Sequence, residues 1–187
     1  MQPGQVLYLA GDAPDGMFGL ASGALEISFP LVAEEPVTVH RAETGFWIGD
    51  AAQLSRRPRM ISIGAATAVK LLHVPGAEVE HLLTEMPRFW PCFYDLNMRN
   101  VETALTLLSE CLALTVKARV CRRLLSLTEH DPAVQITQDD LAKLLGVARA
   151  TVRRAIAELA ADGAVETGYR SLKVRDVAVL RRFKDEQ

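Results

Sequence analysis

Residues 136–159 read ITQDDLAKLLGVARATVRRAIAEL, and this stretch decides the fold of the C-terminal part of the chain. It opens with Thr137, and Asp140 follows three residues later, a spacing typical of the capping box that begins a helix. Gly146 interrupts the helical pattern and permits a tight turn, so a second helix is predicted from about Ala148. The apolar positions form an inner face on each helix: Leu141, Leu144 and Leu145, then Val152, Ile156 and Leu159. This pattern predicts a helix-turn-helix.

The outer side of the second helix is rich in arginine. The residues expected to contact DNA are Arg149, Ala150, Thr151, Arg153 and Arg154, with Thr137 and Gln138 at the start of the first helix. A recognition helix places donors near its N-terminal end in the major groove, and arginine reads guanine through a bidentate contact. Hydroxyls, amides and the backbone N–H groups at helix starts are suited to phosphate. Ala150 offers only space for a base or a methyl group.

A β-hairpin is expected after the second helix. Its strands are Val165–Thr167 and Ser171–Val174, joined by Gly168-Tyr169-Arg170, and Arg170 and Lys173 are available to the DNA backbone. Helix-turn-helix and hairpin together predict a winged helix-turn-helix. The alternative is a solvated basic helix in some other small helical domain.

A long helix is predicted upstream, after Pro87 and Pro91 and as far as about Ala113. Its apolar residues Met98, Val101, Leu105, Leu108 and Leu112 are spaced 3, 4, 3 and 4, which is an a/d seam over two heptads. The seam can pair with its copy in a second chain or pack on the chain's own β domain, and the periodicity leaves both open. Thr115 can cap the next helix, Val116–Thr128.

The N-terminal part reads as short strands separated by turn signals. The candidates are Val6–Ala10, Met17–Ala21, Ala24–Phe29, Val37–Arg41, Arg59–Ala65 and Val69–Val74, and a short helix, Ala77–Thr84, follows them. Leu25, Ile27 and Phe29 alternate with Glu26 and Ser28, as in a half-buried strand. Many short strands at this spacing favour a sandwich or barrel.

Charge is distributed unevenly along the chain. Residues 1–98 hold 6 Lys+Arg and 11 Asp+Glu, a net of −5, whereas residues 99–187 hold 15 and 12, a net of +3. The basic excess therefore lies in the part predicted to meet DNA. The sequence has no apolar run of about 18 residues and no secretory signal, so we expect a cytoplasmic protein without a membrane span.

The three cysteines, Cys92, Cys111 and Cys121, are widely spaced and form no pattern typical of a metal site. We interpret them as free buried thiols, with a thiol redox sensor as the alternative.

Over nearly its whole length the sequence resembles the Crp/Fnr superfamily of bacterial regulators. The resemblance lies in PGQVLYLAGDAPDGMFGLASGALEI, GFWIGDAAQLSRRPRMISIGAAT, KARVCRRLLSL and ITQDDLAKLLGVARATVRRAIAELAADGAVE, in this order. It implies an α+β protein: a double-stranded β-helix (jelly roll) sensor-like domain over residues 1–88, a dimerisation helix over 89–114 and a winged helix-turn-helix over 115–187. It also implies a homodimer on a pseudo-palindromic operator in double-stranded DNA, with RNA polymerase as a further partner.

The recognition helix departs from the family pattern at one position. Arg149 and Arg154 match family positions that read bases, whereas Ala150 replaces an acidic residue that several members use to read cytosine. The operator preference of those members is therefore not transferred to this chain.

Gly49, Asp50, Ala51, Ala52 and Arg59 resemble the phosphate-binding cassette of cyclic-nucleotide sensors. Asp50 stands where those sensors carry glutamate, and Met60 replaces a small residue. On the long helix, Ala104 and Leu105 align with a polar pair that some members use against adenine. We therefore expect a retained scaffold whose ligand is altered or absent, and we do not expect cyclic AMP to be the ligand. Cyclic-nucleotide binding and another effector are the alternatives, and the effector is unknown. The chain lacks the N-terminal cysteine cluster of iron–sulfur members, so no such cluster is expected.

Three functions compete at this stage. The first is a dimeric, sequence-specific transcription regulator, and the second is a ligand-binding module without DNA-binding activity. The third is a cupin-like enzyme, which would need His and Glu clustered on strands. We find no such cluster in the sequence and expect no enzyme.

Overall fold

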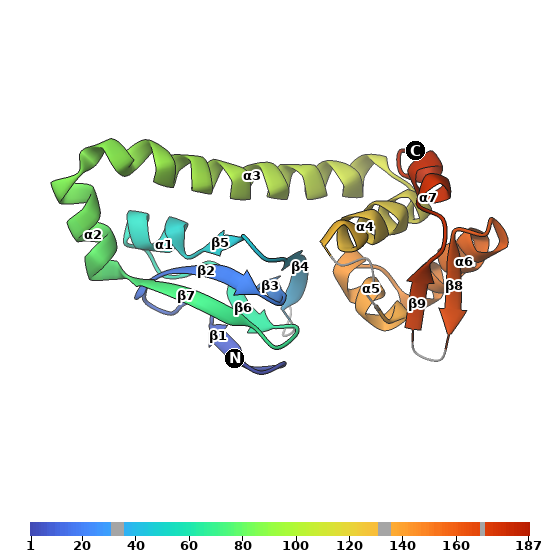
Figure 1. Ribbon diagram of the computed structural model, residues 1–187, viewed down its shortest axis with the longest axis horizontal. Coiled ribbons are helices and arrows are strands. Elements are labelled where there is room, and N and C mark those ends of the chain that lie inside the picture. The colour runs from blue at the N-terminus through green and yellow to red at the C-terminus, as the bar shows by residue number, and fades with distance from the viewer. Residues whose placement is uncertain (31–35, 131–135, 169–170) are drawn as a thin grey trace. The chain divides into compact units, whose positions relative to one another are not determined.

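The computed structural model describes residues 1–30, 36–130, 136–168 and 171–187. These residues form two compact units, residues 1–104 and residues 105–187 (Figure 1). The long helix α3 (Trp90–Ala113) begins in the first unit and ends in the second. Mixed helices and sheets confirm the predicted α+β class.

The first unit is built on two antiparallel sheets. The strands are β1 (Val6–Tyr8), β2 (Gly16–Ser22), β3 (Leu25–Phe29), β4 (Val37–Ala42), β5 (Trp47–Ile48), β6 (Ser62–Ala65) and β7 (Lys70–Pro75). One sheet has the order β1-β6-β3-β4 and the other β5-β2-β7. Residues from both sheets share one apolar core, which includes Leu20 of β2, Leu25 of β3 and Ile63 of β6.

Two short helices belong to this unit, α1 (Asp50–Ser55) and α2 (Gly76–Glu85), and a 3-10 turn over Pro87–Phe89 leads into α3. Pro91 lies in the first turn of α3, where its missing N–H costs no intrahelical hydrogen bond. The long helix therefore starts at Trp90 and not after both prolines.

The six predicted strands are present with shifted ends. Arg59 was expected to begin a strand, but the strand β6 begins at Ser62. The reason is that the backbone N–H of Arg59 donates to Asp12 O at 2.9 Å and its carbonyl accepts from Gly11 N–H at 2.8 Å. These bonds tie Arg59 to a turn outside the sheet.

The second unit contains the predicted winged helix-turn-helix. Its elements are α4 (Val116–His130), α5 (Gln138–Leu145), α6 (Arg149–Ala161), β8 (Val165–Gly168), β9 (Ser171–Val174) and α7 (Val177–Phe183). The three buried side chains predicted on each of α5 and α6 join one core with Leu124 of α4, Leu172 of β9 and Leu180 of α7. Strands β8 and β9 pair antiparallel, as expected for a wing.

The helix starts follow the predicted capping residues. Thr115 Oγ1 accepts the N–H of Ala118 at 3.2 Å. Thr137 Oγ1 accepts the N–H of Asp140 at 3.1 Å and donates its proton to the Asp140 carboxylate at 2.6 Å. The second bond differs from a full capping box, in which the acidic side chain reaches the backbone N–H of the cap residue.

We expect Thr137→Ala to lower the free energy of unfolding by about 1 kcal/mol, because one N–H at the start of α5 loses its acceptor. Urea denaturation in the absence of DNA measures this change. Thr167→Ala, at an exposed position of β8, is the control and should change stability by less than about 0.5 kcal/mol. Equal losses in both variants would contradict the capping role.

Candidate nucleic-acid interface

The turn between α5 and α6 sets the entry of the second helix. Gly146 ends α5 with a φ of 62°, in the left-handed region that favours glycine. The N–H of Val147 then donates to Ala142 O at 3.2 Å, which closes the end of the helix. Ala148 stands at the N-cap of α6 in an extended conformation and makes no side-chain cap bond. The first N–H groups of α6 therefore have no side-chain acceptor at this cap.

One face of α6 is buried and the opposite face is exposed. Val152, Ile156 and Leu159 are at most 1% exposed, whereas Ala150, Arg153 and Arg154 lie in solvent. The helix turns by about 100° per residue, so Arg149 and Arg154 point about 140° apart. They therefore occupy the two flanks of the exposed face, with Ala150 and Arg153 between them.

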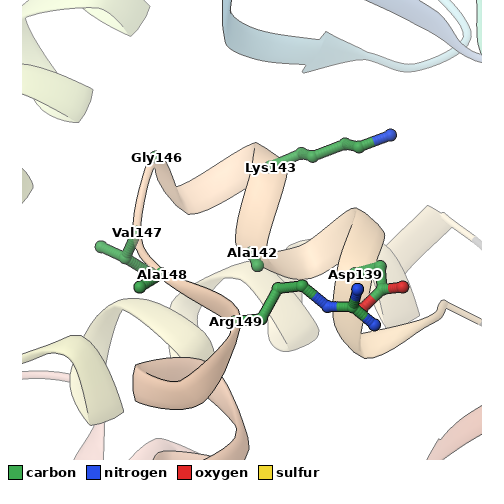
Figure 2. A pocket seen from close by; sticks show the side chains of 7 residues that line it. All are labelled: Asp139, Ala142, Lys143, Gly146, Val147, Ala148 and Arg149. Atoms are coloured by element: carbon green, nitrogen blue, oxygen red, sulfur yellow. The ribbon is translucent and has the colours of Figure 1, made fainter.

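Arg149 lies on the flank that faces α5. Its Nε lies 2.5 Å from Oδ1 of Asp139, in the first turn of α5, and the two side chains form an ion pair (Figure 2). Both side chains line an open cleft of about 650 Å³, together with Ala142, Lys143, Gly146, Val147 and Ala148. Arg149 is 76% exposed despite this ion pair, so its guanidinium remains accessible to a ligand.

Arg154 lies on the other flank, beside the N-terminal end of α4. It lines a cleft of about 220 Å³ with Thr115, Val116, Lys117, Thr151, Ala155, Glu158 and Glu186. Thr151 is half-buried there and does not lie at the centre of the exposed face. Within the described part of the chain, neither Arg153 nor Arg154 forms an ion pair with a carboxylate.

The predicted phosphate contacts are distributed over several elements. Gln138 is half-buried at the start of α5, and the hydroxyl of Thr137 is engaged by Asp140. Lys173 is exposed on β9 and stands opposite Glu166 of β8. Arg170 lies outside the described residues. Arg175, which is not among the predicted DNA contacts, is exposed and pairs with Glu166.

The resemblance to a phosphate-binding cassette falls on the loop before α1 and on α1 itself. Gly49 has a φ of 94°, and a Cβ there would lie 2.8 Å from Gly16 O, so only glycine fits. Ala52 is buried in α1, while Ala51 is half-buried. Met60 is 65% exposed and does not fill the cassette.

Asp50 is buried and is held by two asparagines of α3. Asn97 Nδ2 donates to one carboxylate oxygen at 3.1 Å, and Asn100 Nδ2 donates to the other at 3.2 Å. Neither asparagine is predictable from the sequence, because the contact joins positions about fifty residues apart. Each oxygen of Asp50 thus already accepts a hydrogen bond from the protein.

Arg59 is buried beside the same loop. Its Nη2 donates to Asp15 Oδ1 at 2.5 Å and to Gly16 O at 3.2 Å, and its guanidinium lies 3.8 Å from the ring centre of Tyr8. Burial raises the pKa of Tyr8 to about 12, against the opposing effect of Arg59. Nη1 of Arg59 has no hydrogen-bond partner among the residues described.

The buried polar groups of this loop differ in how far the protein itself satisfies them. The unpartnered Nη1 of Arg59 can donate to an anionic oxygen. In the cassette that this loop resembles, an acidic residue can accept from a ribose hydroxyl. Here that residue is Asp50, which is one methylene shorter than glutamate and is bonded to Asn97 and Asn100. The two positions that align with the adenine-contacting pair, Ala104 and Leu105, carry apolar side chains.

The cysteines differ in exposure. Cys121 is buried in α4, and burial raises the pKa of its thiol to about 11. Cys92 and Cys111 are exposed, so the expectation of three buried thiols was wrong for these two. Both lie on α3, none of whose side chains is buried.

The described residues contain no cluster of His, Cys, Asp and Glu that could hold a metal ion, and none of their helices is long and apolar enough to span a membrane.

Two family models match the chain, one on each side of α3. The model of the cyclic nucleotide-binding domain matches residues 1–86, and that of the Crp-like helix-turn-helix domain matches residues 118–183. Their order is the order of the two units.

Relatives match over nearly the full chain. The cyclic AMP receptor protein of Thermus thermophilus is 26% identical over 96% of this chain and 84% of that protein. The HTH-type transcriptional regulator Cmr of Mycobacterium tuberculosis is 25% identical over 96% of this chain and 72% of that protein. A solved CRP/FNR-family transcriptional regulator from Thermus thermophilus shares the fold, with a TM-score of 0.74 and 23% identity over 100% of this chain and 97% of its own.

With both domains matched in this order, and with regulators of one family as its relatives, the chain belongs to the Crp/Fnr family of transcription regulators.

Proposed function

We propose that this regulator binds an operator as a symmetric homodimer, with α6 of each subunit in the major groove of double-stranded DNA. The observation that carries the proposal is the two-sided character of α6. Its apolar face is buried, and its exposed face carries Arg149, Arg153 and Arg154. The buried apolar face holds α6 in its domain, and the exposed face is therefore available to enter the major groove. We infer that it acts in the cytoplasm, with RNA polymerase as a further partner.

The alternative of a ligand-binding module without DNA-binding activity leaves this arginine face unused. It also gives no role to a unit that matches a helix-turn-helix domain over residues 118–183. The relatives named above are regulators, which favours a non-enzymatic role.

Homodimer formation is supported by the exposed seam of α3. Leu105, Leu108 and Leu112 are 59%, 54% and 80% exposed. A regular row of exposed leucines on one face of a helix is typical of a protein interface. Val101 is also exposed and Met98 is half-buried. Tyr94, four residues before Met98, is 66% exposed and extends the same a/d spacing.

We expect Leu105→Glu combined with Leu108→Glu to produce monomers or to unfold α3, because a charged seam cannot be buried between two helices. Sedimentation at micromolar concentration measures the assembly. Thr106→Glu with Ala113→Glu adds the same charge at exposed positions outside the seam and should leave the dimer intact. A monomeric wild-type chain at that concentration would show that the seam is not an interface.

The DNA contacts are tested by substitution in α6. We expect Arg149→Ala and Arg154→Ala each to cost about 1–3 kcal/mol per guanine contact. The dimer carries each change twice, so the loss of specific binding approaches about a thousandfold. The measurement is a titration against a selected site and a scrambled duplex at several salt concentrations.

Lys173→Ala in the wing is the matched control for these titrations. It should weaken binding to both duplexes alike and reduce the salt slope by about one per phosphate contact in each subunit. If both arginine variants leave the ratio of specific to scrambled affinity unchanged, α6 is not the recognition helix.

We also propose that cyclic AMP is not the effector. Asp50 is buried, is one methylene shorter than glutamate and is bonded to Asn97 and Asn100, so it is poorly placed to reach a ribose hydroxyl. The proposal leaves open a different anion that uses the free Nη1 of Arg59.

Cyclic AMP should therefore change DNA affinity little, and calorimetry should detect no tight binding. Arg59→Ala tests whether any heat of binding comes from the cassette. Arg57→Ala, at an exposed position between the end of α1 and Arg59, is the control. Tight binding of cyclic AMP that disappears in Arg59→Ala but persists in Arg57→Ala would overturn the proposal.

A further inference from the structure

The ion pair between Asp139 and Arg149 joins the two helices of the helix-turn-helix at the surface that faces DNA in the proposed function. We propose that Asp139 is a positioning residue for base recognition, because its carboxylate orients the guanidinium of Arg149 and lowers the affinity for non-specific DNA. The inference rests on the proposed role of Arg149 as a base-reading residue.

The contact is made by the atom of Arg149 that base reading does not need. Nε is the atom of Arg149 that lies 2.5 Å from Asp139 Oδ1 in the ion pair, while the bidentate contact to guanine can be made by Nη1 and Nη2. The ion pair draws the Nε side of the guanidinium towards Asp139 and leaves the four N–H donors of Nη1 and Nη2 for a base. Less side-chain entropy is then lost when Arg149 meets a base.

Stability does not explain the pair. The side chains of Arg149 and Asp139 are 76% and 47% exposed, and an exposed ion pair contributes little to folding. In Figure 2 the guanidinium of Arg149 lies beside the carboxylate of Asp139, whereas the side chain of Lys143 in the same cleft does not reach that carboxylate. The carboxylate of Asp139 therefore pairs with Arg149 of α6 and not with Lys143 of its own helix.

A carboxylate at this surface also repels phosphate. On a scrambled duplex, where Arg149 finds no guanine in register, the negative charge of Asp139 opposes the basic residues around it. On the specific site, the cost is offset because the oriented arginine makes its base contact. Asp139 therefore increases specificity by disfavouring the wrong DNA as well as by favouring the right one.

The neighbouring residue Asp140 provides a matched control. Its carboxylate accepts the proton of Thr137 Oγ1, and its N–H donates to the same oxygen. Adjacent aspartates thus serve two purposes: Asp140 stabilises the start of α5, and Asp139 contacts α6.

The experiment compares Asp139→Asn and Asp140→Asn in the full chain, alone and combined with Arg149→Ala. Binding to the selected site and to a scrambled duplex is titrated at several salt concentrations, and thermal unfolding is recorded for each variant. We expect Asp139→Asn to lower the ratio of specific to scrambled affinity by about tenfold in the dimer, as for the loss of one ion pair in each subunit. Part of this change should come from tighter binding to the scrambled duplex.

In the Arg149→Ala background, the effect of Asp139→Asn on the ratio should largely disappear, because the two residues act through one contact. Asp140→Asn should lower the unfolding temperature and leave the ratio unchanged. Asp139→Glu keeps the charge and should restore part of the ratio.

The outcomes separate this inference from the proposed function. If Arg149→Ala lowers the ratio but Asp139→Asn does not, Arg149 reads DNA without help from Asp139 and the inference is wrong. An equal effect of Asp139→Asn with and without Arg149 also overturns it. If Arg149→Ala itself leaves the ratio unchanged, the assignment of α6 as the recognition helix fails first.

Discussion

The arginines of α6 face solvent because the opposite side of that helix is buried in a core shared with α4 and α5. Val152, Ala155, Ile156 and Leu159 are all at most 5% exposed. Rotating α6 by one residue would bury an arginine and expose a valine or leucine, and an unpaired charge in this core would be strongly unfavourable. The packing of α6 therefore determines which side chains can reach a base, and the proposed readout by Arg149 and Arg154 depends on it.

The end of the long helix is connected to the same core by charged contacts. Arg122 of α4 donates to Glu110 of α3 at 3.1 Å and to Lys184 O, after α7, at 2.8 Å, and it also pairs with Asp185. Hydrogen bonds from Lys184 and Arg122 lower the pKa of Asp185. The N–H of Thr115, between α3 and α4, donates to Glu186 O at 3.0 Å. These bonds attach the last turns of the proposed dimer helix to the DNA-binding unit.

Local patterns predicted much of this fold, and long-range contacts account for what they missed. Thr137, Gly146 and the apolar spacing around them are sufficient for the helix-turn-helix, because caps and amphipathic faces are encoded within a few residues. Strand β5 was missed, since its two residues are defined by pairing with β2. Helix α7 was also missed, although Asp176 caps it through Oδ1 and was a readable signal. The sequence does not predict the pairs Asp139–Arg149, Asp50–Asn97 and Arg59–Asp15, because no periodicity links their positions.

The central claim is that two copies of α6, related by a two-fold axis, read one operator. Selection of bound duplexes from a random pool by the purified chain tests this claim most directly. The account predicts a pseudo-palindromic site with half-sites about 10 bp apart or slightly more, each containing guanine. Enrichment of a single unpaired half-site, or no enrichment over the starting pool, would contradict it.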